Sequence, residues 1–324
     1  DLSDLDLTYE QRNKVADRLN NDPELFYLQF CRSTSLDSSL RFFYIDDISE
    51  EDIDAFEAAV KEALKCVLPG MDDLRKALVL HDYLAVHCRY DKENLDLGNI
   101  PDSSYSAYGP LVLKCGVCEG YDRAYRLLLD RVGIASDSAE SYYMNHAWTI
   151  IKLDGSWYHV DVTWDDPVPD VPGGSMHTNF LCSDDVIKDY EHQHYAWRTS
   201  HECTDTSFDG NVFWKGINNP IIFTDADTFW MLKRQASTRL SLVSRSWETG
   251  EEKTVYSYSD TWYVWGRRDM TWDGAYSGLC LWDNRLLFND DTHIYAYDPA
   301  TDTTETVYTY TGSDGYFYGV FTSD

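Results

Sequence analysis

The sequence predicts an α+β protein whose last third is rich in β-structure. Apolar residues recur at helical spacing through roughly the first 90 residues and again from Val117 to Val132. Two β-rich runs flank Asp154-Gly155, and short aromatic and β-branched runs broken by Asp, Gly and Asn follow residue 201. At 324 residues the chain exceeds one usual domain, so we expect two domains, residues 1–200 and residues 201–324.

The composition indicates a folded, acidic protein. Hydrophobic residues make up 43% of the chain, enough for at least one large core. The formal net charge of -29 repels phosphate backbones and anionic lipid headgroups, so we expect neither nucleic acid nor a membrane surface as a partner. The apolar runs fall short of the roughly 20 residues that span a bilayer. The chain begins at Asp1 rather than Met, and we expect a secreted or cell-surface protein whose signal segment has been removed.

The eight cysteines are spread thinly along the chain instead of being concentrated in a small scaffold. A disulfide framework is therefore not required. Cys66 and Cys88 fall on apolar helical positions, where we expect buried thiols that act as small hydrophobic residues.

Capping signals predict three helices in the N-terminal part. One follows Thr8, with Gln11 as its capping-box partner, a second follows Ser49, and a third follows Asp72. His81 lies on the apolar face of the third helix, so we expect it to be a core histidine with satisfied hydrogen bonds rather than a catalyst.

A fourth helix is predicted from Val117 to Val132. Tyr121, Tyr125 and Leu128 share one of its faces, which predicts a buried helix. Cys118 falls in its first turn. The partial positive charge of a helix N-terminus favours thiolate over thiol, which is the local condition for a reactive cysteine.

The run "HAWTIIKLDGSWYHVDVTWDDP" predicts a β-hairpin with Asp154-Gly155 as its two-residue turn. That turn pairs Trp148 with Asp161 and His146 with Thr163. Because side chains alternate along a strand, all four project from one face, and His146 and Asp161 become diagonal neighbours.

The chain after residue 201 contains an internal echo. The run Thr254–Ser259, "TVYSYS", recurs as Thr306–Thr311, "TVYTYT". A spacing of about 50 residues is that of a four-stranded propeller blade. We therefore expect a small all-β domain of two blade-like repeats, which would bind a substrate or a cell wall.

Cys118, His146 and Asp161 together supply a nucleophile, a base and a residue that orients the base. A cysteine must become thiolate to attack, and imidazole can accept its proton. A carboxylate on the far ring nitrogen fixes the tautomer and stabilises the imidazolium cation.

Three segments carry a resemblance to a known family: "HDYL", "SAYGPLVLKCGVCEGYDRAYRLLL" and the hairpin run above. In this order they resemble the bacterial transglutaminase-like superfamily of papain-type cysteine enzymes, from about Asp72 to Asp185. The resemblance implies an α+β core with a Cys-bearing helix packed against an antiparallel sheet. It also implies that Cys118 is the nucleophile, His146 the general base and acid, and Asp161 the orienting carboxylate.

Several other residues are candidates for the surroundings of this site. A tyrosine hydroxyl, from Tyr105 or Tyr108, can stabilise an oxyanion beside the Cys118 amide, and the sequence does not choose between them. Trp148 and Trp164 can form walls of a substrate groove, although core packing explains them equally well.

The histidines at positions 177, 192, 194 and 201 raise the question of a metal site. They lack a Cys or Glu at recognised zinc spacing, so we expect loop or surface histidines and no metal. The family resemblance implies no organic cofactor.

The reading that follows is a thiol-dependent acyl-transfer enzyme, most simply a peptidase or amidase acting on protein or cell-wall peptides. Two alternatives remain open. One is a non-enzymatic surface or binding protein that keeps the triad as scaffold. The other is a thiol-disulfide oxidoreductase that uses Cys115 and Cys118 of "CGVC", although the preceding segment is only weakly strand-like for that class.

Overall fold

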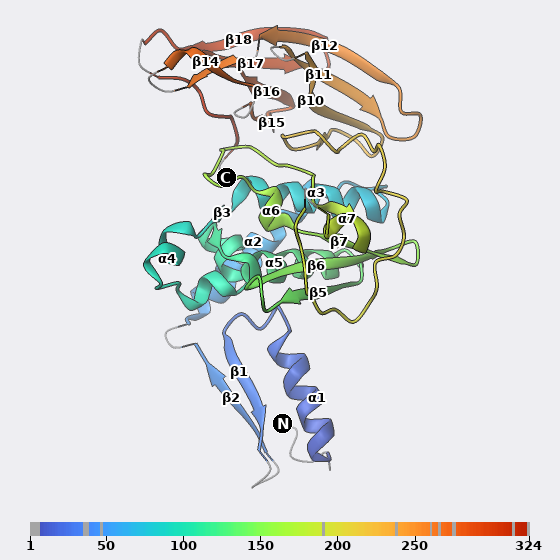
Figure 1. The fold of residues 1–324 in the computed structure, drawn as a ribbon. Coiled ribbons are helices and arrows are strands. Elements are labelled where there is room, and N and C mark those ends of the chain that lie inside the picture. Colours follow the sequence, from blue (N-terminus) through green and yellow to red (C-terminus); the bar gives the residue numbers. More distant parts are fainter. Residues whose placement is uncertain are drawn as a thin grey trace.

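The computed structural model describes residues 7–34, 39–45, 48–189, 192–236, 239–259, 261–264, 267–273, 277–312 and 315–322. Its elements form three tiers along the long axis of the molecule (Figure 1). A helix and a hairpin near the N-terminus form one end, an α+β core forms the middle, and β-sheets form the other end. The last described residues return to the junction between the middle and the β-rich tier.

The N-terminal tier contains α1 (Tyr9–Asn20) and an antiparallel pair, β1 (Leu28–Ser33) and β2 (Leu40–Tyr44). Thr8 and Gln11 form the predicted capping box of α1. The expectation of an all-helical N-terminal part is wrong at β1 and β2. β2 contains three aromatic residues, which favour strands, and Phe30 of β1 stacks on Phe43 across the pair.

The middle tier holds most of the helices. Ser49 and Asp72 cap α2 and α3 as predicted, with side chains that accept from the N–H groups of Asp52 and Arg75. The helical elements are α2 (Glu50–Ala63), the 3-10 turn η1 (Leu64–Cys66), α3 (Asp73–His87), α4 (Lys92–Leu97), the 3-10 turn η2 (Asp102–Tyr105), the π-helical turn η3 (Gly109–Leu113), α5 (Cys118–Arg131), α6 (Val162–Asp165) and α7 (Asp184–Ile187).

One antiparallel sheet lies beside these helices. Its strands follow the chain order β5-β6-β7-β8, and α5 packs on β5 and β6. The Cys-bearing helix therefore lies against an antiparallel sheet, as the resemblance implied. The strands are β5 (Ser136–Ser141), β6 (His146–Leu153), β7 (Ser156–Val160) and β8 (Phe180–Cys182), and a short parallel pair is formed by β3 (Arg89–Tyr90) and β4 (Cys115–Gly116).

The β6–β7 hairpin has the predicted register. Leu153 pairs with Ser156, and Thr149 pairs with Val160. Asp154 and Gly155 have φ values of 49° and 93°, the left-handed conformation that a type I′ turn requires at both central positions.

Beyond Val160 the hairpin prediction is wrong, because β7 ends there. Asp161 is the N-cap of α6, and its side chain accepts a hydrogen bond from the Trp164 N–H at 3.2 Å. Asp is a preferred N-cap residue, and this local preference competes with continuation of the strand. Thr163 lies within α6 instead of opposite His146.

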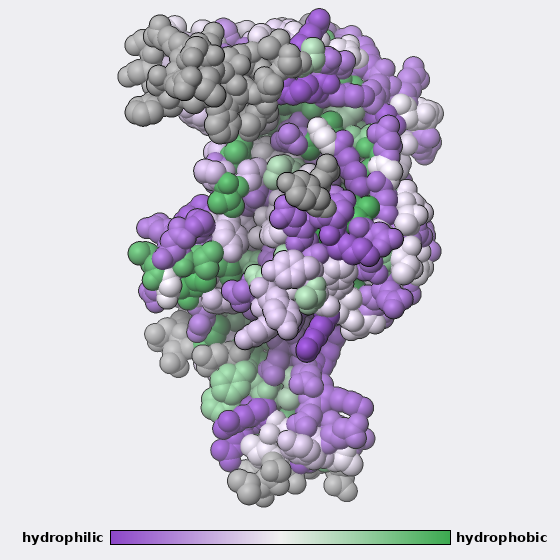
Figure 2. Space-filling model, viewed as in Figure 1, coloured by the Kyte–Doolittle hydropathy of each residue, from purple (hydrophilic) through white to green (hydrophobic). Residues whose placement is uncertain are grey.

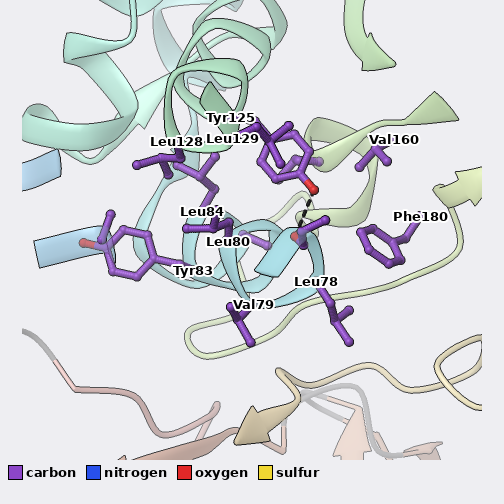
Figure 3. Close-up of a cluster of buried hydrophobic side chains, with 14 of the residues drawn as sticks. Leu78, Val79, Leu80, Tyr83, Leu84, Tyr125, Leu128, Leu129, Val160 and Phe180 are labelled. Carbon is purple, nitrogen blue, oxygen red and sulfur yellow. Dashed lines mark hydrogen bonds between the residues drawn. The ribbon is translucent and has the colours of Figure 1, made fainter. Parts of the chain in front are cut away.

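The core of the middle tier lies between α3, α5 and the sheet (Figure 3). Leu80 and Leu84 of α3 face Leu128 of α5, and Phe180 of β8 lies at the side of α3 near Leu78. The Tyr125 hydroxyl donates to the Ala77 carbonyl oxygen at 2.9 Å, so its polar end is satisfied inside this core. Each fully buried leucine contributes about 1.5–3 kcal/mol.

The C-terminal tier consists of small antiparallel sheets. Two of them have four strands each, in the orders β12-β11-β10-β9 and β15-β16-β17-β18. The two copies of the internal echo lie on matching strands, β12 and β18. The strands are β9 (Ile222–Phe223), β10 (Thr228–Ala236), β11 (Arg239–Ser246), β12 (Glu252–Ser259), β13 (Thr261–Val264), β14 (Arg267–Asp273), β15 (Leu279–Trp282), β16 (Arg285–Asn289), β17 (His293–Asp298) and β18 (Thr303–Thr309).

The surface is mostly hydrophilic in the view of Figure 2, as the acidic composition leads one to expect. Hydrophobic side chains gather on this face around α4, where Leu97 is 72% exposed. Among the described residues no helix is both long and apolar enough to cross a membrane.

Hydrophobic residues on both sides of residue 200 belong to one core cluster. Trp214, Ile221 and Phe229 cluster with Leu78 of α3 and Phe180 of β8. Backbone contacts run across the same junction, since the Ile221 N–H donates to the buried Asp82 carboxylate at 2.7 Å. The boundary at residue 200 stays a prediction, and this shared cluster provides a way to test it.

We expect Trp214→Ala to destabilise the middle tier and the C-terminal tier together. Trp214 is 3% exposed and contacts Phe180 and Phe208, so its removal leaves a cavity that costs about 3–5 kcal/mol. Cys182 and Cys280, both buried, report unfolding of the two tiers by alkylation and mass spectrometry across a urea series. The urea concentrations at which Cys182 and Cys280 become half-alkylated should both fall, by similar amounts.

Trp282→Ala is the matched control, because this tryptophan is 51% exposed and its removal should leave both midpoints in place. A lower midpoint for Cys280 alone, with that of Cys182 unchanged, would show that the two tiers fold independently and would support the boundary at residue 200.

Candidate active site

Cys118 is the first residue of α5, as predicted. The preceding residue, Val117, is the N-cap and has no capping side chain. The first N–H groups of a helix have no carbonyl partner within the helix, so this end of α5 presents free donors and a partial positive charge beside the thiol.

A close backbone approach fixes the position of this helix start. The Val117 N–H donates to the Ser104 carbonyl oxygen at 2.9 Å. A Cβ atom on Gly120 would collide with that same oxygen, and a Cβ on Gly116 would lie 2.7 Å from Pro110 Cγ. The two glycines of "CGVCEG" therefore let the chain before Cys118 and the first turn of α5 lie against η2 and η3.

His146 and Asp161 lie in direct contact. His146 is the first residue of β6, and its Nε2 is 2.6 Å from Oδ2 of Asp161 at the start of α6. The hydrogen bond predicted from the hairpin is present, although Asp161 reaches it from a helix cap. Cys118 Sγ lies 4.0 Å from the carbonyl oxygen of Asn145, the residue before His146.

The positive charge of His146 and the negative charge of Asp161 each stabilise the charged form of the other residue. Burial alone would lower the pKa of His146, but the Asp161 charge and hydrogen bond, together with the Cys118 sulfur, outweigh burial and raise it to about 10. Burial alone would raise the pKa of Asp161, but His146 and then His194 outweigh it and hold that pKa well below its usual range. The arrangement favours an imidazolium beside the thiol and an ionised carboxylate behind the imidazolium.

Aromatic rings surround His146 on the side away from the thiol. Trp148 is 1% exposed, stacks on His146 with 5.5 Å between ring centroids, and donates its indole N–H to His159 Nδ1. Trp164 is 38% exposed and lies 5.4 Å from His146. Neither of these two predicted groove residues is among those that line the groove at Cys118: Trp148 is buried beside His146, and Trp164 is partly exposed beside it.

A groove of about 670 Å³ opens in front of Cys118 and His146. Tyr105 lines the groove and is one of the two predicted oxyanion donors. Tyr108 does not reach it, because its ring stacks on Phe26 and its hydroxyl donates to Asp52 at 2.8 Å. Other lining residues include Tyr90, Leu95, Glu119, Tyr142, Tyr143 and Arg198.

Two residues that were not predicted from the sequence line the groove. Tyr90, which was not a candidate, lines it, and burial first and then Cys118 and Tyr105 raise the pKa of Tyr90 to about 12. Leu95 of α4 extends the groove toward the hydrophobic side chains seen around α4 in Figure 2. Tyr90 and Leu95 lie well before Cys118 in sequence and on other elements, so local patterns around Cys118 and His146 could not place them here.

Cys115 lies apart from this chemistry. It belongs to β4, is partly buried, and pairs with Arg89 of β3. Burial raises its pKa, which disfavours the thiolate that disulfide exchange requires. All eight cysteines are free thiols in the structure.

Three of the four histidines expected on loops or the surface are instead buried: His177, His192 and His194. His201 is exposed and stacks on Trp157. The three buried histidines all lie on loops, as expected, outside the helices and strands. Their burial was not predicted, because each ring has a hydrogen-bonding partner supplied by another segment, which sequence spacing does not reveal. His194 is the one that contacts the site, since its Nε2 is 2.8 Å from Asp161 Oδ2.

Within the part of the chain that the structure describes, three groups bring together side chains that could hold a metal ion: His81 with Asp82 and His177, His146 with Asp161 and His194, and His159 with Asp184 and Cys203. In each group a histidine already pairs with its carboxylate, at 2.6–3.1 Å. These hydrogen-bonded pairs of histidine and aspartate hold the side chains of each group together. His81 is the core histidine predicted from its helix face, with a carboxylate at each ring nitrogen.

Comparison with known proteins identifies a family match over part of the chain. The family model described as "Transglutaminase-like superfamily" matches residues 62–162. A solved structure titled "Crystal structure of a TGase" resembles 36% of this chain at 15% identity, with a TM-score of 0.29. The resemblance spans about a third of that protein, 34% of its chain. No curated protein matches this chain in sequence.

The family match covers two of the motif segments, "HDYL" and the Cys118 segment, and the hairpin run as far as Val162. Cys118, His146 and Asp161 all lie within it, while the expected continuation to Asp185 lies outside. The TM-score shows no more than a distant likeness, so the family model carries the assignment. Residues 62–162 are therefore a core of the transglutaminase-like superfamily, which is typically made up of cysteine enzymes.

Proposed function

We propose that this protein is a thiol-dependent acyl-transfer enzyme in which Cys118 attacks the carbonyl carbon of a peptide or carboxamide. The observation that carries the proposal is the 2.6 Å contact between His146 and the buried Asp161, beside a cysteine at a helix N-terminus that opens onto a groove. This is the arrangement of nucleophile, base and orienting carboxylate that acyl transfer requires.

The proposed reaction has two stages. The Cys118 thiolate forms a bond to the carbonyl carbon, and the imidazolium of His146 gives its proton to the departing amine as the C–N bond breaks. Water then attacks the resulting thioester while His146 takes a proton from it. The C–S bond breaks, a carboxylic acid leaves, and the thiolate and imidazolium are restored.

In each stage the carbonyl oxygen of the substrate becomes negatively charged, and hydrogen-bond donors must stabilise it. The Cys118 N–H lies at the start of α5, where backbone N–H groups have no partner within the helix. Tyr105 is the favoured second donor because it lines the groove, whereas the hydroxyl of Tyr108 is engaged by Asp52.

We favour hydrolysis over transfer to an amine, and protein or cell-wall peptides as substrates. The groove supports a polymeric substrate, since exposed tyrosines, Tyr142 and Tyr143, line it and leave it open to solvent. Water can reach a thioester in such a groove. The secreted or cell-surface location remains part of this proposal.

We further propose that the C-terminal sheets are two blade-like repeats that place the enzyme on its substrate. Their support is the matching order of strands in the two four-stranded sheets and the position of the sequence echo on β12 and β18. Exposed aromatic residues such as Trp282 and Tyr308 offer flat contact surfaces.

Cys118 should be the thiol that iodoacetamide labels first at pH 6–7. Burial raises the pKa of each of the other seven cysteines, so these thiols supply little thiolate in that range. Peptide mass spectrometry of briefly treated native protein identifies the labelled site. His146→Ala should abolish the preference, and a wild-type protein without any preference for Cys118 would favour the binding-protein alternative.

Asp161→Asn should lower the turnover of a peptide amide by about 10²–10⁴-fold, because the amide cannot stabilise the imidazolium or hold its tautomer. The substrate is first found by incubating wild type and Cys118→Ala with peptide and peptidoglycan libraries and reading mass changes. Asp184→Asn is the matched control, since Asp184 pairs with His159 at 2.9 Å in the same tier without touching His146 or Cys118. Near-wild-type turnover in Asp161→Asn would remove this carboxylate from the mechanism.

Cys115→Ser should leave amide cleavage and the labelling of Cys118 largely intact. An oxidoreductase needs both sulfurs, because the second resolves the mixed disulfide that the first forms. Reduction of insulin disulfides provides the assay for that class. Catalytic reduction that disappears in Cys115→Ser and survives in His146→Ala would replace the acyl-transfer proposal with the redox alternative.

A further inference from the structure

A second histidine shares the carboxylate of the candidate triad. His194 is fully buried, and its Nε2 lies 2.8 Å from Asp161 Oδ2, the same oxygen that His146 Nε2 contacts at 2.6 Å. The other oxygen, Oδ1, accepts the Trp164 N–H. Asp161 is thus held from three directions, by β6, by its own helix and by the segment that carries His194.

Both ring nitrogens of His194 face hydrogen-bond acceptors. Its Nδ1 lies 2.8 Å from the carbonyl oxygen of His192, which can only accept. Its Nε2 faces the Asp161 carboxylate, which is ionised and also only accepts. A neutral imidazole has a single N–H, so both hydrogen bonds form together only when His194 is an imidazolium cation.

A cation at His194 would balance the charge of the buried site. When Cys118 is thiolate and His146 is imidazolium, the triad alone carries one negative charge in excess, that of Asp161. Uncompensated charge in a buried site is costly. With His194 as a cation, negative and positive groups alternate from Cys118 to His146, Asp161 and His194, and their sum is zero.

We propose that His194 is a positioning residue of the candidate active site, which fixes the Asp161 carboxylate and offsets its charge so that His146 can release its proton to a leaving group. The role rests on the proposed acyl-transfer function. His194 reaches neither the groove lining nor Cys118 directly, and it acts through Asp161.

The groups that face His194 make Asp161 its counter-ion. The rings of Trp148 and Trp164 lie 4.7 and 4.3 Å from it and exclude water. The rings of His146 and His194 lie 5.7 Å apart, centroid to centroid. Another titratable group nearby is His159, whose ring packs against Trp148. Removing the cation would leave the Asp161 charge uncompensated, which favours protonated His146 and moves its loss of a proton to higher pH.

The test is an NMR titration of the His146 ring in Cys118→Ala protein, where the thiol does not contribute. His194→Gln should raise the His146 midpoint by about 1 pH unit. Gln can donate one hydrogen bond to Asp161 but brings no charge. His192→Gln is the matched control, because His192 is buried on the same segment and contacts Thr178 and Asp189 rather than Asp161. The His192→Gln variant should leave the titration midpoint of His146 unchanged. The NMR signal of His146 is assigned by its loss in His146→Gln.

An unchanged His146 midpoint in folded His194→Gln protein would overturn the proposal. If that variant does not fold, the wild-type chain decides, because ¹⁵N ring shifts at pH 7 should show both nitrogens of His194 protonated. A neutral tautomer there would overturn it equally. Neither measurement requires activity, so a failure of this proposal is distinguishable from a failure of Cys118 labelling, which concerns the proposed function.

Discussion

The arrangement of the middle tier depends on the acidic residues in and around the four-residue helix α6. Asp161 forms a hydrogen bond with His146 of β6. Asp165 forms one with His81 of α3, whose Nε2 lies 3.1 Å from Asp165 Oδ2. Asp166, just after the helix, accepts the hydroxyl of Tyr121 from α5. Burial raises the pKa of Asp166 to about 8. One short segment therefore ties two helices and the central sheet together with hydrogen bonds that are buried or partly buried.

The position of the nucleophile depends on a second constraint, the lack of side chains at Gly116 and Gly120. These glycines allow the start of α5 to approach η2 and η3 so closely that the Val117 N–H reaches the Ser104 carbonyl. Cys118 is fixed from behind by backbone contacts, while His146 is fixed from the other side by Asp161. A site assembled from two rigid supports needs little reorganisation when it reacts.

Local signals in the sequence were enough for the elements that carry the candidate triad. Thr8, Ser49 and Asp72 cap the helices they were expected to cap, and Asp154-Gly155 sets the register that brings His146 toward Asp161. The β1–β2 hairpin was missed because helical period was extended over these two strands. His194 was missed because its partner lies 33 residues away through a loop, and a contact of that kind leaves no periodic trace.

The chain contains several buried pairs of histidine and aspartate, and their surroundings separate structural pairs from a reactive one. His159 accepts from Trp148 and contacts Asp184, so both ring nitrogens are used within the protein. His81 is held between Asp82 and Asp165 in the core. At His146, by contrast, one nitrogen faces Asp161, and the residue lines the same groove as Cys118. A histidine can move protons to and from a substrate only where one nitrogen remains available to a reacting group. Among these three, that condition is met by His146.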